Sequence, residues 1–394
     1  MDRFGDKICC NPTVKLKKQE SYPVIDIDKI TPGYKAVRSV ASIEYTGQGG
    51  AKFQDHDVLF ARITPCLENG KMAIADTEGQ NGIGSTELFV FRGIDGVSDT
   101  DYVYYLLCMK HIRQLAANSM TGASGRQRAD LDFIKRIQWD FPDIEMQKKI
   151  ASVLSAYDNL IEVNNKRIKV LEQMAENLYK EWFVRFRFPG HETAEFENGI
   201  PEGWAYRRDD EVIDFNPTLK TGNQTEFTII PMEALSTNSM VLDSGCFVRQ
   251  DSISGRRSQN GDTLLAKITP CLENGKTGFV MGMPENEVLG GSTEFVVMRS
   301  KALTPHYVYC IARSYYFRQT AILSMNGADG RQRVDEDKLK SAKILQPEKT
   351  VLDHFETIVT PIFDGVYQMV QENKNLIQQR DLLLPRLMSG KLEV

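Results

Sequence analysis

Residues 63–71 read ITPCLENGK, and residues 268–276 repeat this stretch without a change, 205 positions further on (268 − 63). Shorter pieces of sequence return at nearly the same offset. They are NPT at 11–13 and 216–218, STE at 85–87 and 292–294, YVY at 102–104 and 307–309, and GRQR at 125–128 and 330–333. A period of about half of the 394-residue chain predicts two copies of one domain, because solenoid repeats are only about 20 to 50 residues long.

The first part of each copy is predicted to mix strands and helices. Short apolar runs bounded by Gly and Ser, at 87–91 and 294–298, are typical of strands. Residues 102–117 and 307–323 have the length and apolar spacing of helices. The expected fold class is therefore α+β.

Each copy then ends in a long apolar seam. From Ile150 to Trp182, apolar or aromatic residues recur in a 4,3,4,3 rhythm that Asn164 completes, and this is the a/d pattern of a coiled coil. Such a helix would reach roughly 50 Å at 1.5 Å per residue. The second copy repeats the rhythm from Phe355 to Leu387.

The second seam is less regular than the first. Arg380 is its one charged position, and Pro361 and Pro385 are expected to kink or cap the helix. The simplest expectation is that the two helices pair within the chain, with Asn164 and Asn373 fixing their register. Periodicity alone leaves open that these stripes are ordinary core helices of a bundle. The duplication favours a spacer between two equivalent domains.

Composition excludes several classes of protein. The chain has 41% hydrophobic and 26% charged residues and no apolar run of bilayer length, and its N-terminus does not resemble a signal peptide. Seven cysteines without a Cys-x-x-Cys pair and five scattered histidines predict neither a disulfide framework nor a metal site. We expect a cytoplasmic protein with no membrane contact.

The charge distribution points to two basic segments. The net charge is −5, but residues 192–211 hold seven acids against two arginines and account for all of it. Residues 110–136 carry six Lys or Arg against two Asp, and residues 313–343 carry seven against four acids. The two basic segments occupy matching places in the repeat.

No complete catalytic motif is present. The sequence GKT at 275–277 resembles a phosphate-binding loop, but Pro270 occupies the place of the required first Gly. The NPT segments lack the second Pro and the aromatic residue of an amino-methyltransferase loop, and no Gly-rich cofactor loop or Gly-x-Ser-x-Gly elbow occurs. We predict no catalytic residues, no cofactor and no metal.

The duplicated GRQR loops are the leading candidates for contact with DNA. Arginine presents a planar fork to guanine and phosphate, and glutamine suits adenine. The predicted DNA-binding residues are Arg126, Gln127 and Arg128 in the first copy and Arg331, Gln332 and Arg333 in the second. The alternative is that these arginines pair with local acids such as Asp130 and Asp335. Weaker candidates are Arg62, Lys71, Lys267 and Lys276, which flank or end the ITPCLENGK segments.

The ITPCLENGK, STE and GRQR segments together resemble the target recognition domains of the specificity (S) subunits of type I restriction-modification systems. Residues 142–184 resemble the central helical region of that family, and RDLLLPRLMSGKL at 380–392 resembles its C-terminal end. The resemblance covers essentially the whole chain.

The resemblance implies two target recognition domains separated by two long antiparallel coiled-coil helices, each domain reading one half of a bipartite double-stranded DNA target. It implies domains at 1–141 and 189–346 and helical regions at 142–188 and 347–394. It also implies that two modification (methyltransferase) subunits dock on the helices, that restriction subunits join through the complex, and that this chain is not itself an enzyme.

Two functions of other classes stay open at this point. One is a self-sufficient fusion of methyltransferase and recognition domain, and the other is an assembly scaffold without DNA contact. Neither the bases recognised nor the spacer length follows from the sequence.

Overall fold

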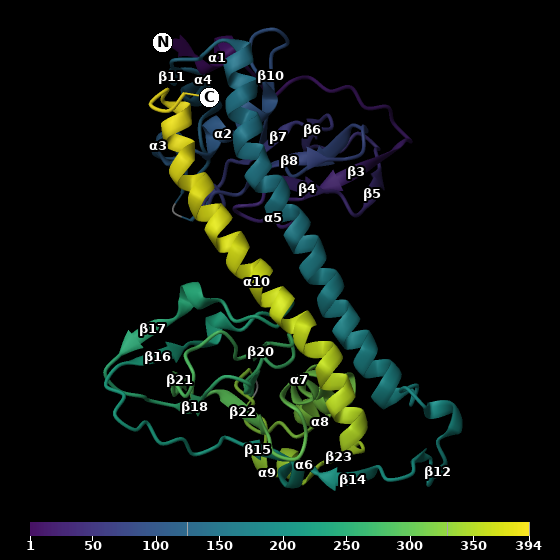
Figure 1. The fold of residues 1–394 in the computed structure, drawn as a ribbon. Coiled ribbons are helices and arrows are strands. Elements are labelled where there is room, and N and C mark those ends of the chain that lie inside the picture. The colour runs from purple at the N-terminus through teal and green to yellow at the C-terminus, as the bar shows by residue number, and fades with distance from the viewer. Residues whose placement is uncertain (124, 329, 394) are drawn as a thin grey trace. The chain divides into compact units, whose positions relative to one another are not determined.

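A computed structural model describes residues 1–394 except Ser124, Asp329 and Val394. It divides into two compact units, the first made of residues 1–163 and 373–394 and the second of residues 164–372. Figure 1 labels the elements of both. Each unit therefore contains one copy of the sequence repeat together with parts of both long helices.

Unit 1 is built on two small sheets. The five-stranded sheet has the order β2 (Ile8–Cys10), β10 (Leu88–Gly93), β7 (Val58–Ala61), β8 (Met72–Asp76) and β4 (Ala36–Arg38). The four-stranded sheet has the order β5 (Ser42–Glu44), β3 (Ser21–Ile25), β9 (Gly82–Gly84) and β6 (Ala51–Phe53). The remaining elements are β1 (Asp2–Arg3), β11 (Gln138–Trp139), α1 (Phe4–Lys7), α2 (Thr100–Cys108), α3 (Lys110–Asn118) and α4 (Leu131–Lys135).

Unit 2 repeats this plan. One four-stranded sheet has the order β15 (Ile213–Phe215), β22 (Phe295–Ser300), β19 (Thr263–Ala266) and β20 (Thr277–Phe279), and the other has the order β17 (Val248–Gln250), β16 (Phe227–Ile230), β21 (Leu289–Gly291) and β18 (Arg256–Ser258). The helices are α6 (Asp209–Val212), α7 (Pro305–Arg313), α8 (Tyr315–Leu323) and α9 (Glu336–Ser341). Short elements are β12 (Phe196–Glu197), β13 (Ile200–Pro201), β14 (Ala205–Arg208), β23 (Lys343–Gln346) and the 3₁₀ turns at 191–193, 232–234 and 244–246.

The repeat extends to the pairing of strands. Phe89 on β10 lies opposite Phe60 on β7, and Val296 on β22 lies opposite Leu265 on β19. All four side chains are buried, and full burial of a residue of this size contributes roughly 1.5–3 kcal/mol. The strands predicted at 87–91 and 294–298 are thus confirmed as central members of their sheets.

The predicted helices at 102–117 and 307–323 are each two helices. Met109 takes an extended backbone conformation between α2 and α3. Ser314 does the same between α7 and α8, where its side chain accepts a hydrogen bond from Phe317 N at 3.3 Å. The apolar spacing of the sequence continues across the breaks at Met109 and Ser314, because both helices of each pair bury a face against the same core. The spacing alone therefore predicted one helix where there are two.

The two long helices are α5 (Ile144–Tyr179), which a π-helical turn (Lys180–Val184) extends, and α10 (Lys349–Met388). Every seam position from Ile150 to Trp182 is buried or half-buried. The helices run antiparallel in each unit, because later residues of α5 contact earlier residues of α10. In unit 2, Asn164 contacts Glu372, and Trp182 contacts Phe355. In unit 1, Asp158 contacts Arg380. In unit 1, Leu154 joins the same core as Leu384 and Leu387.

α10 continues through both prolines, so of the two expected effects, a kink or a cap, the cap is wrong. Val359 and Phe363 on either side of Pro361 are 0% exposed, and Leu384 and Leu387 beside Pro385 are also buried. The apolar contacts of these neighbours offset the backbone hydrogen bond that each proline removes.

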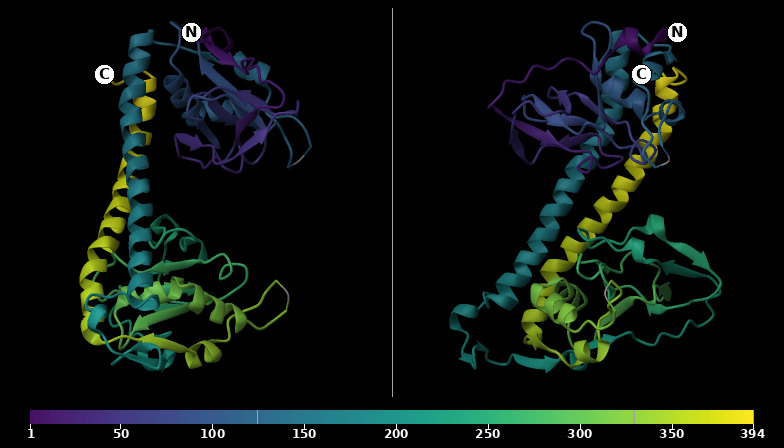
Figure 2. Two further views of the ribbon diagram at one scale, coloured as in Figure 1. Left: turned by 90° about the vertical axis from the view of Figure 1, so that its right-hand side faces the viewer. Right: turned by 180° about the vertical axis from the view of Figure 1, so that it is seen from behind.

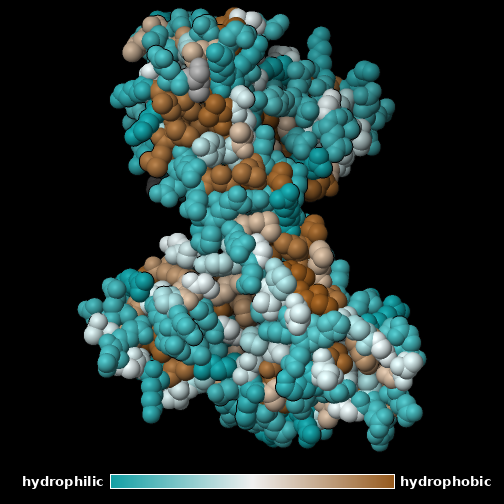
Figure 3. Space-filling view, viewed as in Figure 1, coloured by the Kyte–Doolittle hydropathy of each residue, from teal (hydrophilic) through white to brown (hydrophobic). Residues whose placement is uncertain are grey.

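The surface of each unit is mostly hydrophilic, with hydrophobic areas over the long helices (Figure 3). Among the described residues, no helix is long and apolar enough to cross a membrane.

Candidate nucleic-acid interface

The repeated sequence motifs meet in space in unit 1. Thr121 and Arg128 exchange backbone hydrogen bonds of 3.0 and 2.9 Å across a loop, in which Gly122 and Gly125 take positive φ angles of 124° and 82°. Glycine adopts this conformation without the steric cost that a Cβ imposes. Figure 2 shows the loop extending from the sheets of its own unit.

The ITPCLENGK segment holds this loop. Thr64 N donates to Gln127 O at 3.0 Å, and Gln127 N donates to the Thr64 hydroxyl at 3.1 Å. Strand β7 ends at Ala61, and residues 64–70 form turns. The repeated nonapeptide is therefore mainly a platform of turns that fixes the base of the loop.

Unit 2 reproduces the arrangement bond for bond. Asn326 and Arg333 exchange two hydrogen bonds of 2.9 Å, Thr269 N donates to Gln332 O at 3.1 Å, and Gln332 N donates to the Thr269 hydroxyl at 3.1 Å. Gly327 and Gly330 have φ angles of 127° and 80°. The same loop geometry thus occurs twice because the ITPCLENGK, STE and GRQR motifs each occur twice.

Arg128 and Arg333 are engaged within the protein. The guanidinium of Arg128 binds both carboxylate oxygens of Glu87, with contacts of 2.6 to 3.1 Å. Arg333 binds Glu294 in the same way at 2.7 to 3.0 Å. Each arginine lowers the pKa of its glutamate by hydrogen bonding. The local acids are therefore the repeated Ser-Thr-Glu glutamates, not Asp130 and Asp335.

Arg128 and Arg333 are exposed but paired with glutamates. The other exposed arginines of the two loops are Arg126 and Arg331. Their backbone N–H groups close turns on Ala123 O at 3.1 Å and Ala328 O at 3.0 Å. Neither side chain makes a hydrogen bond or ion pair with a described residue. Gln127 and Gln332 are half-buried, and their backbones bind the threonine platform. The arginine at the second position of GRQR is thus the one available for a ligand in both units.

Lys71 and Lys276 have partners in the fold. Lys71 Nζ donates to Ile27 O at 2.9 Å, and Lys276 Nζ donates to Met232 O at 3.2 Å. Both lysines are half-buried. This geometry favours a role in holding the turn over a contact with DNA.

Arg62 and Lys267 occupy equivalent positions with different surroundings. Arg62 lies 4.7 Å from the centre of the Phe89 ring and lines an open pocket of about 540 Å³. Lys267 instead lies 2.9 Å from the Glu336 carboxylate. The two units therefore differ at this position, beside loops that share the GRQR sequence.

The two seam asparagines are buried, Asn164 at 1% and Asn373 at 7% exposure. Within unit 2, Asn164 Nδ2 donates to Glu372 Oε2 at 2.9 Å. Their role in fixing helix register stays a prediction.

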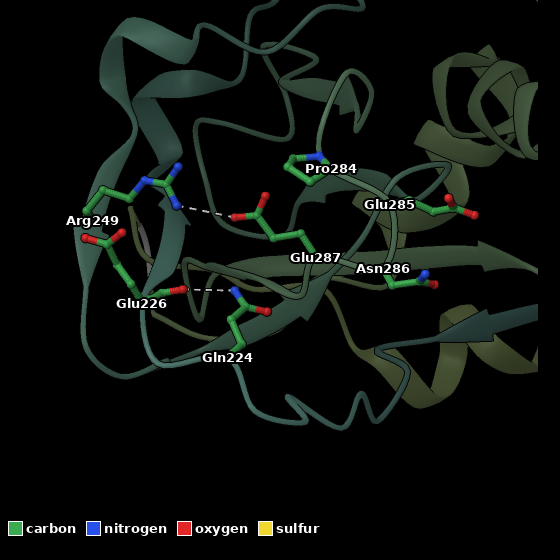
Figure 4. Close-up of a pocket in the computed structure, with 7 residues that line it drawn as sticks. All are labelled: Gln224, Glu226, Arg249, Pro284, Glu285, Asn286 and Glu287. Carbon is green, nitrogen blue, oxygen red and sulfur yellow. Dashed lines mark hydrogen bonds and ion pairs between the residues drawn. The ribbon is translucent and has the colours of Figure 1, made fainter.

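A second pocket, of about 360 Å³, lies in unit 2 away from the loop (Figure 4). Its lining residues are Gln224, Glu226, Arg249, Pro284, Glu285, Asn286 and Glu287. Arg249 is 3.4 Å from Glu287, so the two other glutamates leave the pocket acidic. Such a pocket repels phosphate, and we exclude it as a nucleic-acid site.

Sequence reasoning missed two repeated contacts. Asn11 and Asn216 have φ angles of 48° and 52° and accept hydrogen bonds from the central strands at 2.8 and 3.0 Å. Arg92 forms two bonds of 2.6 and 2.7 Å to Asp57, which is 1% exposed. Arg299 and Asp262 repeat that buried pair. Duplication of Asn-Pro-Thr and Ser-Thr-Glu was the available signal, and it marked a structural role.

Comparisons with known proteins agree with this geometry. Residues 8–173 match the family model described as "Type I restriction modification DNA specificity domain". The chain is 23% identical to the type I restriction enzyme MjaVIII specificity subunit of Methanocaldococcus jannaschii, over 100% of this chain and 92% of the relative. It is 25% identical to the MjaIX specificity subunit of the same organism, over 77% and 72%.

One solved structure supports the fold. The type I restriction-modification system S subunit from M. genitalium is 13% identical, with a TM-score of 0.54 over 98% of this chain and 94% of that chain. These findings confirm the predicted family resemblance and the α+β fold class with paired long helices.

Proposed function

Because residues 8–173 match the family model described as "Type I restriction modification DNA specificity domain", we propose that this chain is the DNA-recognition subunit of a type I restriction-modification complex. It carries no catalytic site, and each recognition domain reads one half of a bipartite double-stranded target. The observation that supports this most directly is the duplicated loop, in which an exposed arginine stands on the same platform of threonine and glutamate contacts in both units.

The loop chemistry suits DNA. The guanidinium groups of Arg126 and Arg331 belong to loops whose bases are fixed by backbone hydrogen bonds, which reduces the backbone freedom that would be lost there on binding. An arginine fork matches the O6 and N7 acceptors of guanine and also binds phosphate. Arg128 and Arg333, paired with glutamates, position the loops.

The test is methylome sequencing of cells that carry single loop variants. Arg126→Ala should reduce modification through one half of the target and Arg331→Ala through the other, with about 1–3 kcal/mol lost for each base-reading contact. Arg207→Ala, which removes an exposed arginine of β14 outside the loop, is the matched control and should leave methylation unchanged. Equal penalties at both half-sites in both loop variants would refute the assignment.

The long helices are proposed to dock two modification subunits and to set the spacing between half-sites. One face of α5 carries exposed apolar side chains, Leu160 and Val163 in unit 1 and Val170 and Met174 in unit 2, each 40–58% exposed. A run of this kind outside the buried seam is typical of a protein interface. Restriction subunits join through the same complex, which acts in the cytoplasm.

The proposed domains are target recognition domains at 1–141 and 189–346 and helical regions at 142–188 and 347–394. A self-sufficient methyltransferase fusion would bind S-adenosylmethionine as the isolated chain, which isothermal titration can measure. A scaffold without DNA contact would give no footprint at two separated half-sites in the assembled complex.

A further inference from the structure

Arg62 and Lys267 hold equivalent positions beside the two loops, but only Lys267 is paired with a carboxylate. The offset of 205 places Arg62 of unit 1 opposite Lys267 of unit 2. In both units the backbone at this position is tied identically: Arg62 N donates to Glu87 O and Lys267 N to Glu294 O, each at 2.9 Å. Any difference between the two cations therefore arises from side chains around them.

Lys267 is neutralised by a carboxylate. Its Nζ lies 2.9 Å from Glu336 Oε1, and its side chain is only 14% exposed. The same oxygen is 2.5 Å from Arg256, and the other oxygen accepts from Asn216 Nδ2 at 2.8 Å. Glu336 thus holds two cations and an amide in a closed cluster.

Unit 1 lacks the residues that build this cluster. Leu131 stands where unit 2 has Glu336, and Ala51 stands where it has Arg256. The Arg62 guanidinium makes no hydrogen bond or ion pair to any described residue, and its Nε is buried without a partner. The positive charge of Arg62 is therefore not neutralised by a described carboxylate, whereas that of Lys267 is.

The space around Arg62 is continuous with the loop. The pocket of about 540 Å³ that Arg62 lines also includes Asn11, Phe89, Thr121, Arg128 and Leu131. Thr121 and Arg128 belong to the loop that we propose contacts DNA. Stacking on Phe89 holds the guanidinium plane while leaving its N–H edge for an anion.

Two acids on the pocket wall do not account for the difference. Asp130 accepts from Asp132 N at 2.8 Å, and Asp132 lies 3.1 Å from Lys135. Unit 2 has the same pattern, in which Asp335 accepts from Asp337 N at 3.1 Å and Asp337 lies 3.6 Å from Lys340. These acids occur in both units, so among the described residues around the two cations Glu336 is the acid that unit 1 lacks.

We propose that Arg62 binds a DNA phosphate beside the loop of unit 1, whereas Lys267 is held by Glu336 and makes no such contact. The two half-sites are thus contacted unequally although both loops share the GRQR sequence and the same backbone hydrogen bonds. This inference rests on the proposed function, since it assigns a contact within the same DNA interface.

The test is the salt dependence of DNA binding by the assembled complex of specificity and modification subunits, on a duplex that carries the target found by methylome sequencing. The slope of log K against log salt is negative, and each lost phosphate contact should reduce its magnitude by about 0.9. Arg62→Gln should show this change and weaken binding roughly tenfold, Arg62→Lys should retain the slope, and Lys267→Gln should leave it nearly unchanged.

Substitutions at the equivalent positions Leu131 and Glu336 give an independent test of the same inference. Leu131→Glu should neutralise Arg62 and reproduce the loss, whereas its uncharged control Leu131→Gln should not. Glu336→Gln should free Lys267 and steepen the slope by about 0.9 for each cation released. Melting temperature and assembly with the modification subunits identify any variant that fails to fold.

Equal slope losses for Arg62→Gln and Lys267→Gln would overturn the inference. A loss for Arg62→Gln that depends on the base sequence and leaves the slope unchanged would also overturn it, in favour of base contact. If the wild-type complex shows no sequence-selective binding at all, the proposed function itself fails, and that outcome is distinct from both.

Discussion

Removal of one partner of the buried ion pair Arg380–Asp158 should strongly destabilise unit 1. Arg380 on α10 is 9% exposed, and Asp158 on α5 is 6% exposed. Their charged groups are in direct contact, and Asp158 also accepts from the Tyr105 hydroxyl at 2.5 Å. Arg380 further donates to Gly33 O at 3.3 Å, so one side chain ties the C-terminal helix to α5 and to a loop of the recognition domain.

The expected magnitude follows from burial. Arg380→Met leaves the Asp158 carboxylate buried with only the Tyr105 hydroxyl beside it, and an uncompensated buried charge of this kind costs about 3–5 kcal/mol. For a unit of this size, that loss lowers the melting temperature by roughly 6 to 20 °C. The double variant Arg380→Met, Asp158→Leu removes both charges and should recover most of the loss, because apolar pairs often replace buried ion pairs without cost.

Calorimetry of the full chain measures the change, and hydrogen exchange of peptides from residues 373–388 assigns it to unit 1. Lys349→Met is the matched control, since it breaks an exposed pair with Asp353 at 2.5 Å on the same helix and should leave the transition nearly unchanged. If Arg380→Met costs no more than Lys349→Met, or if the double variant is as unstable as the single one, the buried-charge reasoning is wrong.

Three further predictions concern pH, the loop and the spacer. Burial raises the pKa of Asp209 to about 7. The protonated carboxyl therefore makes its full contribution to the stability of unit 2 below its unfolded pKa of about 4, and up to roughly 4 kcal/mol of that stability is lost as pH rises through 7. Asp209→Asn should flatten this dependence of stability on pH, which urea titrations between about pH 4 and 8 measure. Glu87→Gln should release Arg128 and reduce methylation several-fold through the half-site of unit 1 alone, with little change in melting temperature, and parallel loss at both half-sites would contradict it. Deletion of residues 161–167 together with 370–376 removes one heptad from each helix, about 10.5 Å or three base pairs; methylome sequencing should find the same half-sites closer together, and the original separation with full activity would contradict the proposed spacer.

The sequence alone was sufficient to predict the duplication, the fold class and the helical seam. These features depend on patterns that are repeated or periodic. Identical nonapeptides 205 positions apart permit only two copies of one domain, and a 4,3,4,3 rhythm buries its apolar face in any helix that adopts it. The Gly-rich sequence before Arg126 likewise predicted a turn at this place.

Tertiary structure alone decided which cations are available. Arg126 and Arg128 are two residues apart in one loop, yet only Arg128 meets a carboxylate, and that carboxylate lies 41 positions away at Glu87. Arg62 and Lys267 hold equivalent positions, yet Glu336 neutralises only Lys267, from 69 positions away. Sequence patterns show the periodicity of each segment. Whether a cation is neutralised depends on which distant carboxylate comes within about 3 Å of it, and only the folded chain sets that distance.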